Sequence, residues 1–218
     1  MSATVPGPEP RWGIAELRAA LLARDGGDWL RRAEAEVNNH PDAVARLFAE
    51  VPRRLAPHPV AGWPAGVAGR AVLLAALLTA PAGGPDRLVD LYRYADSGEK
   101  LAILCALPEL PDRGELTAVG LPLLHDALRT NDIRLVAAAL GPYARHLGPE
   151  AWRQGVLKCV FMGIPLAVVD RLSERADAEL AVMLHGLAAE RLAAGRDLPA
   201  DAVALLRSLS GPTTAREN

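Results

Sequence analysis

Lys158 is the residue whose surroundings most strongly indicate chemistry. It is the only charged residue in the segment 157–169, which reads LKCVFMGIPLAVV. We expect most of this segment to lie in a helix that begins at Pro149 and is broken by Pro165, and that is apolar on all sides here and therefore buried. Burial disfavours an ammonium charge, so Lys158 is predicted to bind an anion or to act as a nucleophile or base. The structural alternative is an ion pair, with Asp170, Asp132 or Glu190 as the partner.

A second group of charges is predicted on one long helix from about Ser173 to Gly195. At 100° per residue its leucines form an apolar stripe, and Glu179 and Glu190 lie near one another at the border of that stripe. Arg175 lies one turn before Glu179. Charges at such a border either line a pocket for an anion or polar ligand, or cover the core with their stems while their heads stay in water.

Two further positions allow either a structural or a functional interpretation. The run Arg129-Thr130-Asn131-Asp132 is typical of a helix junction, because Asn and Asp side chains satisfy open backbone donors. A ligand role for this run, which includes Asn131, is the alternative. Tyr143 follows Gly141-Pro142, where we expect a helix kink and a freed carbonyl that the phenol can satisfy.

The sequence lacks the motifs of common enzyme classes. Its five histidines are dispersed, with no pair four residues apart, and it has no HExxH, GxSxG or DDxxD motif. The glycines before Arg70 lack the lysine-threonine ending of a phosphate-binding loop. Cys105 and Cys159 lie in apolar runs and are predicted to be buried free thiols. No metal and no cofactor is expected.

Helical periodicity runs through nearly the whole chain, and no stretch alternates with period two for long enough to predict a strand. We predict an all-α fold of about ten helices in an irregular α-α superhelix, with HEAT-like or armadillo-like stacking. Among these helices, a very apolar one spans residues 66–79, and Pro52 ends an earlier one. Residues 1–210 are expected to form a single domain, followed by a frayed tail at 211–218.

Composition excludes several function classes. The net charge is −2 and the basic residues are scattered, so no basic stripe for nucleic acid is present. Only Lys100 and Lys158 are lysines. The longest apolar run, 71–80, is far shorter than the roughly 20 residues that span a bilayer. Residues 1–10 show no signal-peptide pattern, so we expect a cytoplasmic protein without a transmembrane segment.

From Leu128 onward the chain resembles the EboA family. Four segments carry the resemblance: LRTN at 128–131, GPY at 141–143, AWRQGVLKCVF at 151–161 and AERLAAGR at 189–196. The similarity is clear over roughly residues 128–200 and diffuse before them. The chain departs from the family pattern at four positions, where the family has three asparagines and a tryptophan: Gly141, Arg153, Asp177 and Leu192.

The resemblance implies a role in secondary-metabolite biosynthesis or metabolite traffic. It suggests as partners a small-molecule metabolite or the enzymes of the same gene clusters: a UbiA-like prenyltransferase, a TatD-like hydrolase, a sugar-phosphate cyclase and a TIM-barrel isomerase-like protein. It implies no catalytic residue set. The positions that match its motifs are the candidate ligand-binding residues: Asn131, Tyr143, Trp152, Lys158, Arg175, Glu190 and Arg196.

Three hypotheses follow. In the first, the protein is a non-catalytic scaffold that binds a polar or prenylated metabolite or a partner enzyme. The three basic candidates would supply positive charge that binds an anion. The two aromatic candidates would form a stacking or apolar wall of the binding site. In the second, it is an enzyme acting on a cyclitol-like or prenylated metabolite, with Lys158 as nucleophile or base and Glu190 as proton shuttle. In the third, these charges only hold helices together.

Overall fold

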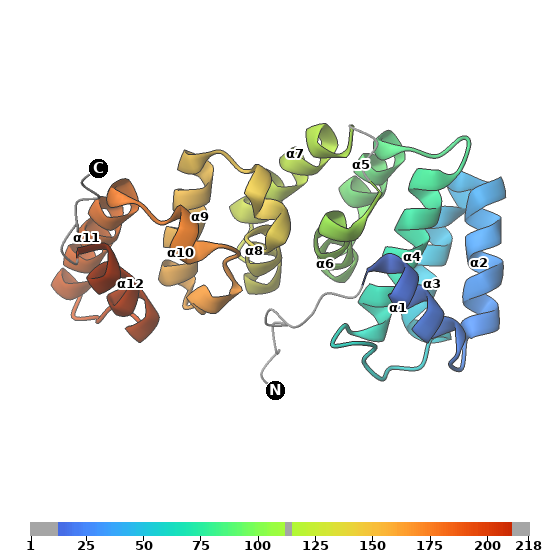
Figure 1. Ribbon diagram of the computed structural model, residues 1–218, viewed down its shortest axis with the longest axis horizontal. Helices are drawn as coiled ribbons and strands as arrows, with labels where there is room; N and C mark the ends of the chain where they lie inside the picture. Colours follow the sequence, from blue (N-terminus) through green and yellow to red (C-terminus); the bar gives the residue numbers. More distant parts are fainter. Residues whose placement is uncertain (1–12, 112–114, 211–218) are drawn as a thin grey trace, which may run out of the picture.

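The fold is all-α, as predicted, and elongated. The computed structural model describes residues 13–111 and 115–210, and these form α-helices and short 3-10 helices with no strand. The chain passes from one end of the molecule to the other, with α1 to α4 at one end and α11 and α12 at the opposite end (Figure 1). The superhelical arrangement of the stack stays a prediction. The predicted tail at 211–218 lies outside the described residues.

The α-helices are α1 (Ile14–Leu22), α2 (Gly27–Asn39), α3 (Val44–Arg54), α4 (Ala65–Thr79), α5 (Pro85–Tyr94), α6 (Ser97–Ala106), α7 (Leu116–Arg129), α8 (Ile133–Ala139), α9 (Pro149–Met162), α10 (Leu172–Arg175), α11 (Ala178–Ala193) and α12 (Ala200–Ser210). The 3-10 helices are η1 (Pro41–Ala43), η2 (Leu107–Glu109), η3 (Pro142–His146) and η4 (Leu166–Val168). Within the part of the chain that the structure describes, no helix is both long enough and apolar enough to cross a membrane.

Helix α4 is the centre of the N-terminal half. Its sequence contains a single charged residue, and it is buried along most of its length against α1, α2, α3 and α6. A β-carbon on Gly69 would lie 2.4 Å from Leu55 Cδ1, so α4 and the end of α3 approach more closely than side chains would allow. Two clusters of buried side chains meet in this helix, one on the α1–α3 side and one on the α6 side.

Arg70 on α4 binds a carbonyl that a proline has left without its helical partner. Pro52 lies inside α3, and because it has no N–H it cannot donate to the carbonyl of Phe48, four residues earlier. Arg70 Nε donates to this Phe48 oxygen at 3.0 Å, and the guanidinium lies 5.2 Å from the centroid of the Phe48 ring. Glu99 of α6 lies 3.5 Å from Arg70. This single side chain therefore ties α3, α4 and α6 together.

Three helix boundaries differ from the sequence prediction. Helix α3 continues past Pro52, because Arg70 satisfies the carbonyl that the proline frees. The helix predicted from Pro149 to Pro165 ends earlier, at Met162, because Gly163 follows it in the left-handed conformation with φ 71°. The long helix predicted over 173–195 is broken into α10 and α11. Asp177 causes this break by capping α11, since its carboxylate accepts a backbone N–H from the first turn.

We expect Arg70→Met to lower the free energy of unfolding by about 1–3 kcal/mol, because it leaves a buried carbonyl without a donor. Pro52→Ala returns an N–H to the helix, so the same Arg70 substitution should cost less in that background. Urea denaturation of the four proteins in this double-mutant cycle measures the difference. Equal costs in both backgrounds would contradict the carbonyl-binding role of Arg70.

Candidate functional site

An open groove of about 580 Å³ lies where the C-terminal half of α7 meets α9, with one residue of α11 at its edge. Its polar lining residues are His125, Arg129, Asn131, Gln154 and Lys158. Its apolar lining consists of Leu128, Ala151, Gly155, Leu157, Phe161, Met162 and Leu187. The groove therefore contains Asn131 and Lys158 of the predicted site.

Small residues on α9 allow the walls of the groove to approach one another. A β-carbon on Gly155 would lie 2.8 Å from Leu140 Cδ2 and 3.3 Å from Leu128 Cδ2, so α9 packs directly onto the ends of α7 and α8. Ala151, one turn earlier on the same face, also lines the groove. Bulkier side chains at these two positions would push α9 away and change the shape of the groove.

The ammonium of Lys158 binds the C-terminal end of α7. Its Nζ donates to the backbone oxygen of Leu128 at 2.7 Å, and the side chain is half-buried. Leu128 belongs to the last turn of α7, where carbonyls have no partner within the helix. Lys158 therefore avoids the cost of burying its charge by capping a helix. An ammonium has three donors, and this contact uses one of them.

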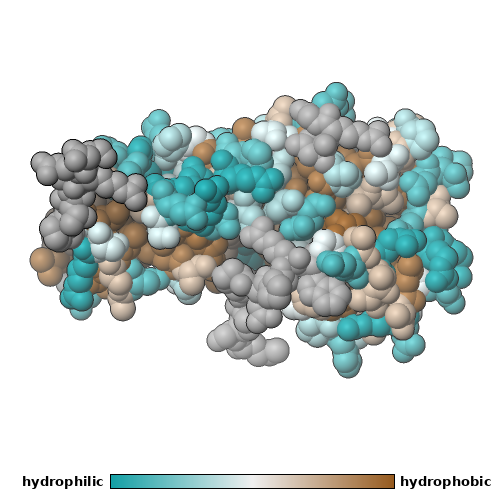
Figure 2. All heavy atoms as spheres, in the orientation of Figure 1, coloured by the Kyte–Doolittle hydropathy of each residue, from teal (hydrophilic) through white to brown (hydrophobic). Residues whose placement is uncertain are grey.

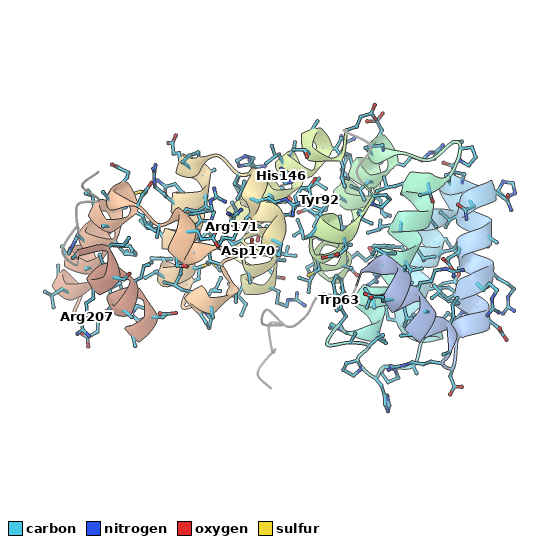
Figure 3. All side chains as sticks on the ribbon, in the orientation of Figure 1. Trp63, Tyr92, His146, Asp170, Arg171 and Arg207 are labelled. Atoms are coloured by element: carbon cyan, nitrogen blue, oxygen red, sulfur yellow. The ribbon has the colours of Figure 1, made fainter. Side chains whose placement is uncertain are left out.

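The second lysine contacts the same half of α7 from the other side. Lys100 Nζ lies 3.4 Å from Asp126 Oδ2 and 4.6 Å from the centroid of the Tyr92 ring. Figure 3 labels Tyr92 in the middle of the molecule. Arg129, which lines the groove, lies 3.6 Å from the other oxygen of Asp126. Both lysines of the chain thus contact the last two turns of α7.

The junction between α7 and α8 combines a structural residue with a groove residue. Asp132 caps α8 by accepting the backbone N–H of Arg134 at 2.9 Å, and the Arg134 side chain donates to both oxygens of the same carboxylate. The contacts with Arg134 hold the pKa of Asp132 below its usual range. Asn131 precedes this cap, is exposed and lines the groove. The capping interpretation holds for Asp132, whereas Asn131 faces the site.

Arg175 lies in a separate cluster, away from the groove. Its two terminal nitrogens donate to the backbone oxygens of Ala144 at 2.6 Å and Leu147 at 2.9 Å. The guanidinium also lies 4.7 Å from the centroid of the Trp152 ring. Burial lowers the pKa of Arg175 from its ordinary value, and the nearby charge of Arg171 acts in the same direction. In these contacts Arg175 holds the end of η3 against α9.

The two aromatic candidates are core residues. Trp152 is 1% exposed and Tyr143 is 3% exposed. A β-carbon on Gly120 of α7 would lie 2.6 Å from Tyr143 Cε1, and the ring of His146 lies 4.7 Å from that of Tyr143. Figure 3 shows His146 in the middle of the stack. These burial values leave neither aromatic ring with a face for a ligand.

The remaining two candidates, Glu190 and Arg196, lie outside the groove. Both are exposed, Glu190 in the last turn of α11 and Arg196 in the turn that follows. Because α10 and α11 are separate helices, Glu190 does not lie on the same helix as Arg175. Figure 3 shows Asp170 and Arg171 just before α10 beside α8, where the Asp170 N–H donates to the Leu140 oxygen. The seven predicted residues are therefore distributed over three places.

The thiols are poor nucleophiles. Cys159 is buried and Cys105 is half-buried, and burial raises the pKa of each to about 12. Both therefore carry a proton at neutral pH, and a thiolate is the reactive form. Within residues 13–111 and 115–210, no three His, Cys, Asp or Glu side chains lie close enough together to hold a metal ion.

A family comparison accounts for most of the chain. The family model described as "Metabolite traffic protein EboA" matches residues 50–207. The chain belongs to the EboA family. The EboA match begins near the end of α3, so it extends well before the segment 128–200 in which the motifs are clear, and it covers every residue that lines the groove. No curated protein and no solved structure matches closely enough to add to this assignment.

The seven candidates omit four polar or aromatic residues of the groove, although three of the four lie within the segments that carry the resemblance. These are His125, Arg129, Gln154 and Phe161. A signal for two of them is present in α9, because Gln154, Lys158 and Phe161 recur at spacings of four and three and so share one helix face. Phe161 is 70% exposed on that face. Arg129 belongs to the run 129–132, for which a ligand role is the alternative interpretation. For His125 the sequence gives no signal, because its place in the groove depends on how α7 meets α9.

We expect Arg175→Lys to lower the free energy of unfolding by about 2 kcal/mol. A lysine cannot bind two carbonyls as a planar fork, and it does not stack on Trp152 as a guanidinium does. Urea denaturation measures the change, with the exposed Arg196→Lys as the control that should stay within about 0.5 kcal/mol of wild type. A variant as stable as wild type would show that these contacts do not hold η3 on α9.

Proposed function

We propose that this EboA protein binds a small metabolite without transforming it, in the groove between α7 and α9. The ligand is an anion with an apolar body. The types of residue that line the groove support this proposal. Two cations, Arg129 and Lys158, and two side-chain amides, Asn131 and Gln154, lie beside apolar side chains, and no residue that lines the groove is acidic. In a protein of net charge −2, this is a local excess of positive charge.

Arg129 is the cation best placed to meet a ligand. Its side chain is 74% exposed, and its partner Asp126 lies 3.6 Å away, which makes a weak surface ion pair. A guanidinium offers planar donors that match a carboxylate or a phosphate. Lys158 lies deeper and already donates to Leu128, so it adds charge with its remaining donors. Asn131 and Gln154 then supply neutral hydrogen bonds for orientation.

The apolar part of the groove favours a ligand with a hydrocarbon or aromatic body. Phe161 is 70% exposed, although removing a large aromatic side chain from water is favourable in free energy. Met162, Leu128 and Leu187 line the groove with it. A ligand that covers Phe161 removes apolar surface from water, while its charged end meets Arg129. The proposal thus accounts for an exposed aromatic residue and a local cluster of donors with one ligand.

The catalytic alternative requires Lys158 and Glu190 to act on one substrate. Lys158 lines the groove and Glu190 does not. We therefore expect borohydride treatment in the presence of carbonyl metabolites to leave Lys158 unmodified, as read by mass spectrometry of the peptide that contains it. A reduced adduct on Lys158 would instead support a Schiff-base enzyme. Lys158→Met should lower the melting temperature, because it removes the cap from α7.

Binding is tested with three matched probes: geranyl monophosphate, geraniol and inorganic phosphate. We expect only the first, which joins an anionic head to an apolar body, to raise the melting temperature and to give heat in titration calorimetry. Arg129→Glu should weaken its binding roughly tenfold or more, because a charge-assisted contact becomes a repulsion. Phe161→Ser should weaken it as well.

Arg93→Glu is the matched control. Arg93 lies in the last turn of α5 and pairs with Asp90 at 3.7 Å, the same spacing and nearly the same distance as in the Arg129–Asp126 pair. It does not line the groove, so its reversal should leave binding unchanged. Equal losses in the Arg93 and Arg129 variants would indicate a general charge effect and would reject the groove. The cluster-encoded enzymes stay predicted partners, and this assay does not involve them.

A further inference from the structure

The charges around the groove indicate how many negative charges its ligand carries. Two cations, Arg129 and Lys158, line the groove. Asp126 does not line it, but its carboxylate lies 3.6 Å from Arg129. An uncompensated carboxylate at this distance would repel an anion bound to Arg129. The other contacts of Asp126 therefore decide what net charge a ligand meets.

Lys100 of α6 compensates the charge of Asp126. Its Nζ lies 3.4 Å from Asp126 Oδ2, and its side chain is only 23% exposed. Water screens this pair less than it screens the Arg129–Asp126 pair, in which the arginine is largely exposed. Like Asp126, Lys100 does not line the groove. Because the acid is balanced from the α6 side, Arg129 and Lys158 leave two positive charges at the groove.

The C-terminal end of α7 does not cancel these charges. Carbonyls in the last turn of a helix carry partial negative charge and repel an anion unless donors cover them. Lys158 covers the Leu128 oxygen, and Thr130 covers the Ala127 oxygen with its backbone N–H at 3.1 Å and its hydroxyl at 2.8 Å. A carbonyl is neutral overall, so its contact with Lys158 leaves the full ammonium charge in place.

His125 is a third donor on the α7 side of the groove. It lies one turn before Arg129, so the two side chains project from the same face of α7. His125 is exposed, and no residue within 13–111 and 115–210 forms a hydrogen bond or an ion pair with its ring. A neutral imidazole donates one N–H. His125 can therefore donate to a head group that Arg129 also binds.

The apolar lining lies on the other side of the groove. At 100° per residue, Leu157 and Phe161 lie roughly 120–160° around α9 from Gly155, which packs against α7 and α8. They therefore face away from α7, and Leu187 of α11 lines the same groove. Hydrophobic side chains also reach the surface at the α11–α12 end in the space-filling view (Figure 2). The groove thus has a cationic side at α7 and an apolar side toward α11.

We propose, on the basis of the binding function proposed above, that the groove selects the phosphate monoester of an apolar alcohol. Such a head carries about 1.5 to 2 negative charges at pH 7. These charges match Arg129 and Lys158, and the three terminal oxygens of the phosphate provide acceptors for both cations and for His125. A carboxylate or a phosphodiester carries one charge and leaves one cation uncompensated. The head lies against α7, and the apolar body lies against α9 and α11.

Three probes with one geranyl body measure this charge selectivity: geranyl monophosphate, its methyl phosphodiester and geranic acid. Titration calorimetry at about pH 7.5 keeps the monophosphate close to a dianion. We expect the monophosphate to bind at least roughly tenfold more tightly than either monoanion. A monoanion that binds as tightly would overturn the selectivity and leave anion binding by the groove intact. Absence of binding by all three probes would overturn the proposed function as well.

Asp126→Asn tests the charge count without changing the lining of the groove. Asparagine has nearly the shape of aspartate and still accepts a hydrogen bond from Lys100, but it removes the negative charge beside Arg129. The affinity for the monophosphate should rise roughly threefold, and that for the phosphodiester should rise less, because repulsion scales with ligand charge. Asp90→Asn is the matched control, since Asp90 forms a similar pair with Arg93 at 3.7 Å outside the groove. Equal gains for both ligands would contradict selection by charge.

His125→Leu tests the third donor. The variant keeps a side chain of similar size and should bind the monophosphate roughly fivefold more weakly, because one hydrogen bond to the head is lost. His185→Leu, at an exposed position of α11 outside the groove, should bind it like wild type. Circular dichroism melting should show that both variants stay folded. Unchanged binding by the His125 variant would reject this residue as a ligand of the phosphate.

Discussion

Backbone carbonyls that lack a helical partner must find a donor wherever short helices meet inside a protein, because burying them unpaired is costly. In this chain the donors at several such places are cationic side chains. Arg70 binds the carbonyl freed by Pro52, Lys158 binds the end of α7, and Arg175 binds two carbonyls at the end of η3. These contacts join helices that are far apart in sequence, and they require that each cation lies among apolar residues.

The same constraint explains what could and could not be predicted. The spacing of apolar residues and the composition identify the all-α fold and the buried helix α4, because these two features depend on the local sequence pattern. The boundary at Pro52 was wrong because the donor that rescues its carbonyl comes from another helix. The break before α11 was missed because Asp177 favours a helix cap there more strongly than the leucine stripe favours continuity. Tertiary contacts decided these boundaries.

The candidate site shows a similar division. An isolated cation in an apolar segment indicates that Lys158 needs a partner, and the partner in the structure is a carbonyl and not one of the proposed acids. Motif matching placed seven residues together that the structure distributes over three places. The groove depends instead on the close approach of α7 and α9 at Gly155, and a glycine in sequence does not identify its neighbour. Membership in the EboA family was recognisable from short motifs, whereas the geometry of the binding surface was not.

The position of the two lysines has a practical consequence for mapping contacts of this protein. Lys100 and Lys158 both touch the final turns of α7, and every other basic side chain is an arginine or a histidine. Amine-directed crosslinkers therefore have a single internal region to react with, next to the groove. A partner that docks on α2, at the end of the stack away from α7, lies far from both lysines (Figure 1). Carboxylate-directed chemistry would sample every face, because acidic residues are spread along the chain.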